Sequence, residues 1–324
     1  MNNIMIKVSR ARTALKVGLK TLQAKPGQFI LLPDYCCDVL LHPLKELGLK
    51  TISYEVLDDL SPNWNQLNQL DTSNVFGIIM VHFFGQPQDI EKFQNFCTLK
   101  NIYLIEDNAH GFGGVYKENN LGTFGDIGIS SPRKILNIPL GGVLYLKRET
   151  ANVNLDLFLK KVPLHLSFFN YIKFIIYGYK PLYKKLLFMK LRKYDNSDPY
   201  AFKEKVQSNN FLSYFEKQAI NRSQIKDIAS NRRKLWLDWS TYLTKKGLKP
   251  VHATLAEGLC PWVIAFYAED ISHRNSWIEW GLQRNLSLFC WPSLPDEEIQ
   301  KRGLAFRRWE KIICVGLDDS PPTT

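Results

Sequence analysis

Strand-like segments that alternate with helical ones are the feature that most restricts the fold of this chain. Residues 75–84 are almost continuously apolar, residues 90–100 have helical spacing, and residues 102–105 are apolar again. Near-continuous apolar strands are typical of parallel sheets covered on both faces, and the alternation favours an α/β fold. Further strands are predicted at 28–32, 50–56, 125–130 and 143–147, with helices from about residue 9 and over 38–47.

An acid and a lysine follow two of these strands. Asp107 comes after the strand at 101–106, and Lys134 follows the strand at 125–130. Open α/β sheets bind ligands at the carboxyl ends of their strands. A lysine can form a Schiff base with a carbonyl, and pyridoxal phosphate pairs such a lysine with an acid at its pyridinium nitrogen. The pair therefore indicates a pyridoxal-phosphate site. Glu106 is expected to point to the opposite side of its strand.

The ordered motifs around this pair resemble the sugar aminotransferase (DegT/StrS) family. They are IEDNAHGFGG from Ile105, LGTFGD from Leu121, Lys134 itself, and the glycine pair Gly141-Gly142. The resemblance is clear over residues 9–146, looser over 208–295, and fades between them. It implies a fold-type-I, pyridoxal-phosphate-dependent transferase. Such a protein has a large domain with a mostly parallel sheet flanked by helices, and a smaller α+β C-terminal domain.

The resemblance assigns roles at the cofactor ring. Lys134 would be the catalytic lysine that holds the cofactor, and Asp107 would keep the ring nitrogen protonated. His110 stands where the family has a glutamine or histidine that contacts the cofactor. Cys37 stands where the family often has a stacking aromatic residue, so a thiol is expected there instead. The cationic neighbour Arg133 is expected to lower the pKa of Lys134.

The resemblance also predicts a phosphate site. Arg12 and Thr13 match the family's phosphate-binding step, although Ala11 stands where glycine is usual. They lie at the start of a predicted helix, whose N-terminus attracts anions; Ser9 is expected to cap it. A serine before the catalytic lysine completes the family's site, and either Ser130 or Ser131 would serve. The residues alone do not decide between them.

The function implied by the resemblance is amino transfer from glutamate or glutamine to a keto-sugar, expected to be nucleotide-linked. The setting would be the biosynthesis of surface polysaccharide or antibiotic sugars, and the enzyme would be a homodimer. Lys134 argues against the relatives that carry histidine there and dehydrate sugars. Family members usually have several tens of residues before the equivalent of Ser9. The alternative is therefore a catalytically altered or inactive member that binds pyridoxal phosphate or a sugar and docks at a membrane surface.

Charge and cysteine content limit the other classes. The formal charge of +11 fits a solvated basic face, or attraction to an anionic partner such as a nucleotide-linked substrate or anionic lipid, with nucleic acid ranked lower. The six cysteines show neither metal-ligand spacing nor a disulfide framework, so no metal site is predicted. The N-terminus has no signal-peptide pattern and no apolar run is long enough to span a bilayer. We expect a cytoplasmic location, with membrane association as an addition.

The segment 158–194 departs from the family. Aromatic residues alternate with lysines, acids are absent between Leu157 and Tyr194, and Pro163 and Pro181 are expected to break it into short helices. Such helices pack on the large domain or on a partner subunit, with their lysines outward, or lie at an anionic membrane surface. The same interleaving also suits single-stranded nucleic acid. We predict packing first and membrane contact second.

The C-terminal part reads as a small domain. Helices are predicted within 212–248 and at 271–284, and strands at 260–268 and 286–290. Arg232 and Arg233 are expected outside, Trp291 in a core, and His82 in a structural role. We therefore divide the chain into a cofactor-binding domain at 1–157, a basic aromatic insertion and linker at 158–198, and a small domain at 199–324.

Overall fold

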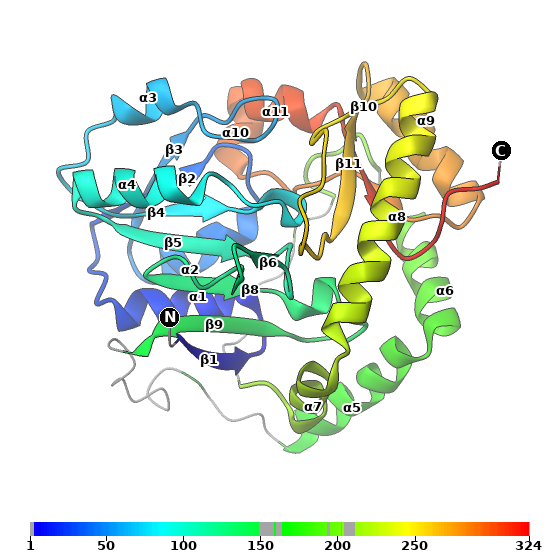
Figure 1. Cartoon of the computed structure of the whole chain (residues 1–324), viewed down its shortest axis with the longest axis horizontal. Coiled ribbons are helices and arrows are strands. Elements are labelled where there is room, and N and C mark those ends of the chain that lie inside the picture. The colour runs from blue at the N-terminus through cyan, green and yellow to red at the C-terminus, as the bar shows by residue number, and fades with distance from the viewer. Residues whose placement is uncertain are drawn as a thin grey trace.

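A seven-stranded sheet forms the centre of the computed structural model, which describes residues 3–148, 159, 164–192, 195–201, 203 and 211–323 (Figure 1). Its strand order is β1-β9-β8-β5-β4-β2-β3. Strands β3, β2, β4, β5 and β8 run parallel, and β9 and β1 are antiparallel additions at one edge. The strands are β1 (Asn3–Val8), β2 (Phe29–Pro33), β3 (Lys50–Tyr54), β4 (Val75–Val81), β5 (Tyr103–Asn108), β8 (Ile127–Ser130) and β9 (Gly142–Lys147). The predicted mostly parallel sheet is confirmed, whereas β1 was not predicted.

Local sequence explains the best-predicted elements. All seven residues of β4 are buried, as expected for a strand covered on both faces. Helix α4 (Ile90–Lys100) begins where the Asp89 side chain accepts a hydrogen bond from the Lys92 N–H at 3.1 Å, and it ends at Asn101 in the left-handed conformation. Helix α1 (Ala11–Thr21) packs on β8 and β9. Its N-cap is Arg10, without a side-chain cap bond, so the expected Ser9 cap was wrong.

Short elements complete this half of the chain. The predicted helix at 38–47 consists of a 3-10 turn η1 (Asp38–Leu40) and helix α2 (Leu41–Glu46). The remaining elements are α3 (Trp64–Asn68), the 3-10 turns η2 (Phe83–Gly85) and η3 (Pro132–Lys134), and the hairpin of β6 (Val115–Tyr116) and β7 (Asn119–Asn120). Turns η2 and η3 follow β4 and β8 directly, so they lie at the carboxyl edge of the sheet.

A second, four-stranded antiparallel sheet forms the small C-terminal domain. Its order is β10-β11-β13-β12, and helices α8 and α9 contact its strands. Trp236 and Trp239 from α8 share a core with Ile264 and Phe266 of β11. The elements are α8 (Ile225–Lys245), β10 (Lys249–Pro250), β11 (Val263–Tyr267), α9 (Ile271–Gln283), β12 (Leu288–Phe289), α10 (Asp296–Lys301), α11 (Leu304–Trp309) and β13 (Ile312–Gly316). Strand β13, which pairs with both β11 and β12, was not predicted.

Three helices lie between the two sheets in sequence: α5 (Leu164–Gly178), α6 (Lys180–Leu191) and α7 (Tyr214–Arg222). In Figure 1, α5 and α6 run along the lower right edge of the molecule. The break between them is at Tyr179, and Pro181 stands within the first turn of α6, where its missing N–H costs nothing. The boundary at 157 lies outside the described residues, so the three-domain division stays a prediction.

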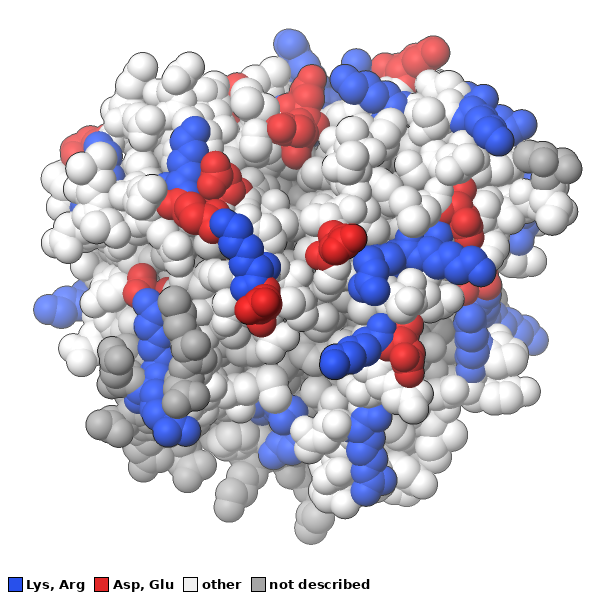
Figure 2. Space-filling model, viewed as in Figure 1, with Lys and Arg blue, Asp and Glu red and all other residues white. Residues whose placement is uncertain are grey.

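The surface charge is dispersed on the face seen in Figure 2, where lysines and arginines are interspersed with acids. This face therefore fits the solvated interpretation of the net positive charge. Among the described helices, none combines the length and the apolar character needed to cross a membrane.

Candidate active site

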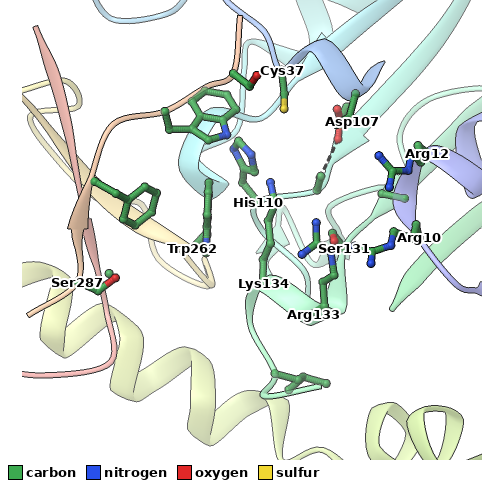
Figure 3. A pocket seen from close by; sticks show the side chains of 18 of the residues that line it. Arg10, Arg12, Cys37, Asp107, His110, Ser131, Arg133, Lys134, Trp262 and Ser287 are labelled. Atoms are coloured by element: carbon green, nitrogen blue, oxygen red, sulfur yellow. Dashed lines mark hydrogen bonds between the residues drawn. The ribbon is translucent and has the colours of Figure 1, made fainter. Parts of the chain in front are cut away.

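A cavity of about 400 Å³ lies where the carboxyl ends of β4, β5 and β8 meet the start of α1 and the small sheet (Figure 3). Helix α6 and one residue of α8 complete its wall. Six of the residues predicted from sequence line it: Arg12, Cys37, Asp107, His110, Ser131 and Lys134. The fold thus collects residues from four separate stretches of the chain around one hollow.

Asp107 and Glu106 point to opposite sides of β5, as the strand period predicts. Asp107 lines the cavity, where its Oδ1 accepts a hydrogen bond from the Ala109 N–H at 2.8 Å. Burial raises the pKa of Asp107, and the Ala109 N–H and the positive charge of Lys134 counteract part of that rise. Asp107 is therefore a carboxyl group whose charged form would gain from a further cation in the cavity.

Phe84, in the turn after β4, fixes the orientation of the His110 ring in the cavity. Its Nδ1 accepts the Phe84 N–H at 3.0 Å, and its ring stacks on Phe84 at an interplanar angle of 8°. Burial, with Lys134 close by, lowers the pKa of His110 well below its ordinary value. The imidazole is therefore neutral, with its proton on Nε2.

Lys134 lies in turn η3, directly after β8, and reaches the centre of the cavity. Its Nζ lies 4.2 Å from the centre of the Trp262 ring, a cation–π distance. The glycine pair explains how this turn meets helix α1: a Cβ on Gly142 would lie 2.2 Å from the backbone carbon of Arg10. Only glycine permits that approach, which the Gly141 N–H secures by donating to the Ser9 carbonyl at 3.0 Å.

Cations gather at one end of the cavity. Arg10 and Arg12 come from the start of α1, and Arg133 comes from η3; all three line the cavity beside Ser131 (Figure 3). The Ser131 hydroxyl is 3.5 Å from the Gly141 carbonyl oxygen. Guanidinium groups and a hydroxyl at a helix start are groups that bind phosphate. Sequence reasoning identified Arg12 but not Arg10.

Two predicted phosphate ligands lie outside the cavity lining. Ser130 is fully buried at the end of β8, where its Oγ accepts from Asn108 Nδ2 at 3.3 Å. Thr13 is buried in the first turn of α1, with its hydroxyl 3.4 Å from that of Ser9. Of the two serines left open by the sequence, the structure brings Ser131 to the cavity.

One prediction about the far wall was wrong, because Arg232 is buried rather than outside. It projects from α8 into the cavity wall and donates to the Trp262 carbonyl at 3.0 Å and the Pro261 carbonyl at 3.3 Å. Arg233 also turns inward, donating to the Leu259 carbonyl at 2.9 Å. Both arginines bind carbonyls of the segment before β11, which no local pattern in α8 could reveal.

Aromatic residues of the small domain also face this cavity. Trp262 and Trp291 line it, each within 5 Å of the His110 ring centre (4.8 and 4.7 Å). The sequence suggested that the aromatic cluster here was core, and Trp291 is indeed almost fully buried. Trp291 also lines the cavity, so the same side chain packs in the core and forms part of the site wall.

His82 occupies the structural position that was predicted for it. It is fully buried and bonds Glu106 on the side of β5 away from the cavity, at 2.9 Å. Its Nδ1 accepts the Gln88 N–H at 3.1 Å, so Nε2 carries the proton that is donated to Glu106.

Comparison with known sequences places the N-terminal half in a family. Residues 2–158 match the DegT/DnrJ/EryC1/StrS aminotransferase family. GDP-perosamine synthase of Escherichia coli O157:H7 is 28% identical over 149 residues, which is 44% of this chain and 40% of that protein. A dTDP-4-dehydro-2,3,6-trideoxy-D-glucose 4-aminotransferase of Saccharopolyspora spinosa is 24% identical over 144 residues, 44% of this chain and 37% of that protein. The matching stretch thus spans about two fifths of these relatives' length.

Comparison of structures extends the likeness to almost the whole chain. Helicobacter pylori PseC, an aminotransferase involved in the biosynthesis of pseudoaminic acid, superposes with a TM-score of 0.68 at 14% identity, over 96% of this chain and 81% of that one. The pyridoxal-phosphate form of the Streptococcus pneumoniae sugar aminotransferase Spr1654 has a TM-score of 0.68 at 15% identity, over 97% of this chain and 81% of that one. Residues 2–158 therefore match the DegT/DnrJ/EryC1/StrS aminotransferase family, as their motifs predicted. Almost the whole chain has the fold of the solved aminotransferases named above.

Proposed function

We propose that this protein is a pyridoxal-phosphate-dependent aminotransferase that moves an amino group from glutamate or glutamine to a keto-sugar. The observation that supports this most is that Asp107 and Lys134, from two different strand ends, line one cavity with a group of arginines at its end. Names of the relatives, which are GDP- and dTDP-sugar enzymes, favour a nucleotide-linked acceptor.

The groups around the cavity fit pyridoxal phosphate. Lys134 provides the amine for the aldehyde, Asp107 a carboxylate for the ring nitrogen, and His110 a flat neutral ring beside it. Arg10, Arg12 and Ser131 would hold the phosphate. When bound, the cofactor supplies an electrophilic carbon and an electron-accepting ring.

The protein's own residues would perform three tasks. Asp107 would hold a proton on the ring nitrogen, since a cation there stabilises the buried carboxylate. Lys134, on the face of Trp262, would move a proton at the substrate carbon as general base and then acid. Trp262 and Trp291 would exclude water from that carbon, because they cover the cavity from the small domain.

Covalent labelling tests this proposal without requiring the natural substrate. The purified protein is incubated with pyridoxal phosphate, reduced with borohydride and digested, and we expect the phosphopyridoxyl group on Lys134 by mass spectrometry. Lys134→Ala should remove the label, whereas Lys147→Ala, a lysine of β9 that pairs with Asp126, should keep it. Labelling elsewhere, or equal labelling of Lys134→Ala, would overturn the proposal.

The amino donor and acceptor are then identified separately. Glutamate or glutamine should change the visible absorption of the loaded protein, and a panel of nucleotide-linked keto-sugars should restore it. Loading without any response to amino donors would favour the catalytically altered member considered above. The homodimer and its interface stay predictions.

A further inference from the structure

The helices α5 and α6 expose apolar side chains on regularly spaced positions. On α5 these are Phe168, Ile172 and Ile175, and on α6 they are Leu182, Leu186 and Met189, all between 38% and 63% exposed. The spacing i, i+4, i+7 places each trio on one face of its helix. We call these six residues the apolar face. Soluble proteins scatter exposed apolar residues singly, whereas a grouped set marks a contact surface.

Helix α6 has two different sides. Tyr183, Leu187 and Leu191 line the cavity that contains Lys134, and the intervening Phe188 is buried in the main core. The Lys184 ammonium pairs with Asp319 at 2.5 Å and that of Lys180 donates to the Asp318 carbonyl at 3.2 Å, which anchors this side. The apolar face lies on the other side. Contacts on its inner side thus hold α6 against the rest of the protein. Its apolar side chains on the outer side are exposed although the helix is packed.

Positive charge accompanies the apolar face. Exposed Lys173 and Lys185 lie on these two helices, and α5 and α6 contain no Asp or Glu in their sequences. At the lower right of Figure 2, beside the part of the molecule where Figure 1 places α5, the surface that is not grey is mostly uncharged and carries isolated Lys or Arg side chains. Apolar residues mixed with lysines match the interface of an anionic bilayer, which accepts both.

A second copy of the chain fits this face less well. A twofold interface would bring the same face of both copies together, so lysines would meet lysines without an acid from either helix. Lysine is depleted in protein interfaces, and burying it without a partner is costly. At a bilayer, in contrast, lysine keeps its ammonium among the headgroups while its stem lies on apolar neighbours.

We propose that the α5–α6 face docks this protein on membranes that contain anionic lipids. Docking would place the Lys134 cavity next to the bilayer, because α6 separates the cavity from the apolar face. The proposal does not depend on the proposed function, since none of the docking side chains lines the cavity.

Vesicle sedimentation tests the docking. The full chain is mixed with vesicles of phosphatidylcholine plus phosphatidylglycerol, or of phosphatidylcholine alone, at low and high salt. We expect co-sedimentation with the anionic vesicles, weakened by salt. Lys134→Ala should bind equally well, so failure of the catalytic proposal and failure of docking are separate results. No binding to anionic vesicles would overturn the proposal.

Apolar substitutions locate the surface. In the triple variant Ile175→Gln, Leu182→Gln, Leu186→Gln, sedimentation should be lost. The matched control replaces three leucines that are at least as exposed as Leu186, namely Leu99, Leu237 and Leu304, by glutamine and should bind like the wild type. Equal binding by both triple variants would show that the face is not the contact.

Lysine substitutions test the charge. Lys173→Gln with Lys185→Gln should weaken binding roughly 25-fold, since each surface lysine contributes about fivefold. The control Lys45→Gln with Lys245→Gln removes the same charge from exposed positions elsewhere and should change binding far less. Sedimentation velocity without lipid adds one decisive outcome: a wild-type dimer that the apolar triple variant abolishes would assign the face to a second copy instead.

Discussion

Glu106 and Asp107 are neighbours on one buried strand, yet their surroundings differ in the number of hydrogen-bond donors. Glu106 accepts from His82 and from the N–H groups of Gly122, Phe124 and Gly125, at 2.5–3.1 Å. The contact that the structure gives the Asp107 carboxylate is the Ala109 N–H, and its other side faces the cavity. One carboxylate is thus bonded within the fold, and the other faces the cavity, where our proposed function assigns it to the cofactor.

A third buried acid extends this comparison. Glu216 of α7 is fully buried, and neither carboxylate oxygen has a hydrogen-bond partner among the described residues. Burial raises its pKa to about 7. Among the described residues, Glu106 thus accepts hydrogen bonds from four donors, Asp107 from one and Glu216 from none. The contribution of each acid to stability should follow that order, and the following substitutions test it.

The largest effect is expected from Glu106→Gln. The glutamine can accept bonds with only one of its two terminal atoms, so one pair of donors loses its acceptor, either His82 with Gly122 or Phe124 with Gly125. We expect the free energy of unfolding to fall by about 2–5 kcal/mol, measured in urea. The control Glu91→Gln breaks an exposed pair with Lys117 and should cost less than about 1 kcal/mol. Equal losses in both variants would contradict the structural role of Glu106.

Glu216→Gln should act in the opposite direction. Because folding raises the pKa of Glu216, the stability that its protonated form contributes is complete below the ordinary carboxyl pKa of 4.5 and is lost as the pH rises to about 7. Glutamine does not titrate. The variant should therefore exceed the wild type by roughly 2–3 kcal/mol at pH 8 and match it near pH 4. A constant difference across this range would show that Glu216 does not titrate in the folded state.

Asp107→Asn should separate stability from ligand binding. Burial raises the pKa of Asp107, so its carboxylate weakens the fold without the cofactor as the pH rises, and asparagine should unfold no more easily at neutral pH. Binding of pyridoxal phosphate should weaken by at least about tenfold, because a charge-assisted bond to the ring nitrogen is lost. Thermal unfolding with and without the cofactor measures both. If Asp107→Asn markedly lowers the free energy of unfolding without the cofactor, Asp107 has a structural role like that of Glu106.

The smallest effect concerns His110. Its pKa lies well below the ordinary value, because burial and Lys134 oppose a positive charge there. We therefore expect its imidazole resonances to stay unchanged by NMR above about pH 6. A titration near neutral pH would show that the ring is open to water and that the Phe84 N–H does not occupy Nδ1.

Much of this site was predictable because its signals are local. Asp107 and Lys134 each follow a strand that apolar sequence defines, and parallel strands end at one edge of a sheet. Alternation along β5 separated Glu106 from Asp107. Helix α4 was predicted over residues 90–100, and the structure ends it at the same residues, with Asp89 as its N-cap and Asn101 as its C-cap.

Tertiary contacts decided the rest. Whether Ser130 or Ser131 enters the cavity depends on the register that pairs Ser130 with Asn108, which turns Ser130 into the core. Arg232 turns inward because the carbonyls of Pro261 and Trp262 lie across from it, about thirty residues later in the chain. The sequence by itself determined the strands, the acid and the lysine, since each depends on neighbours along the chain. Only the folded structure decided which arginines, tryptophans and serines meet them, because those contacts join residues whose separation in sequence carries no periodic signal.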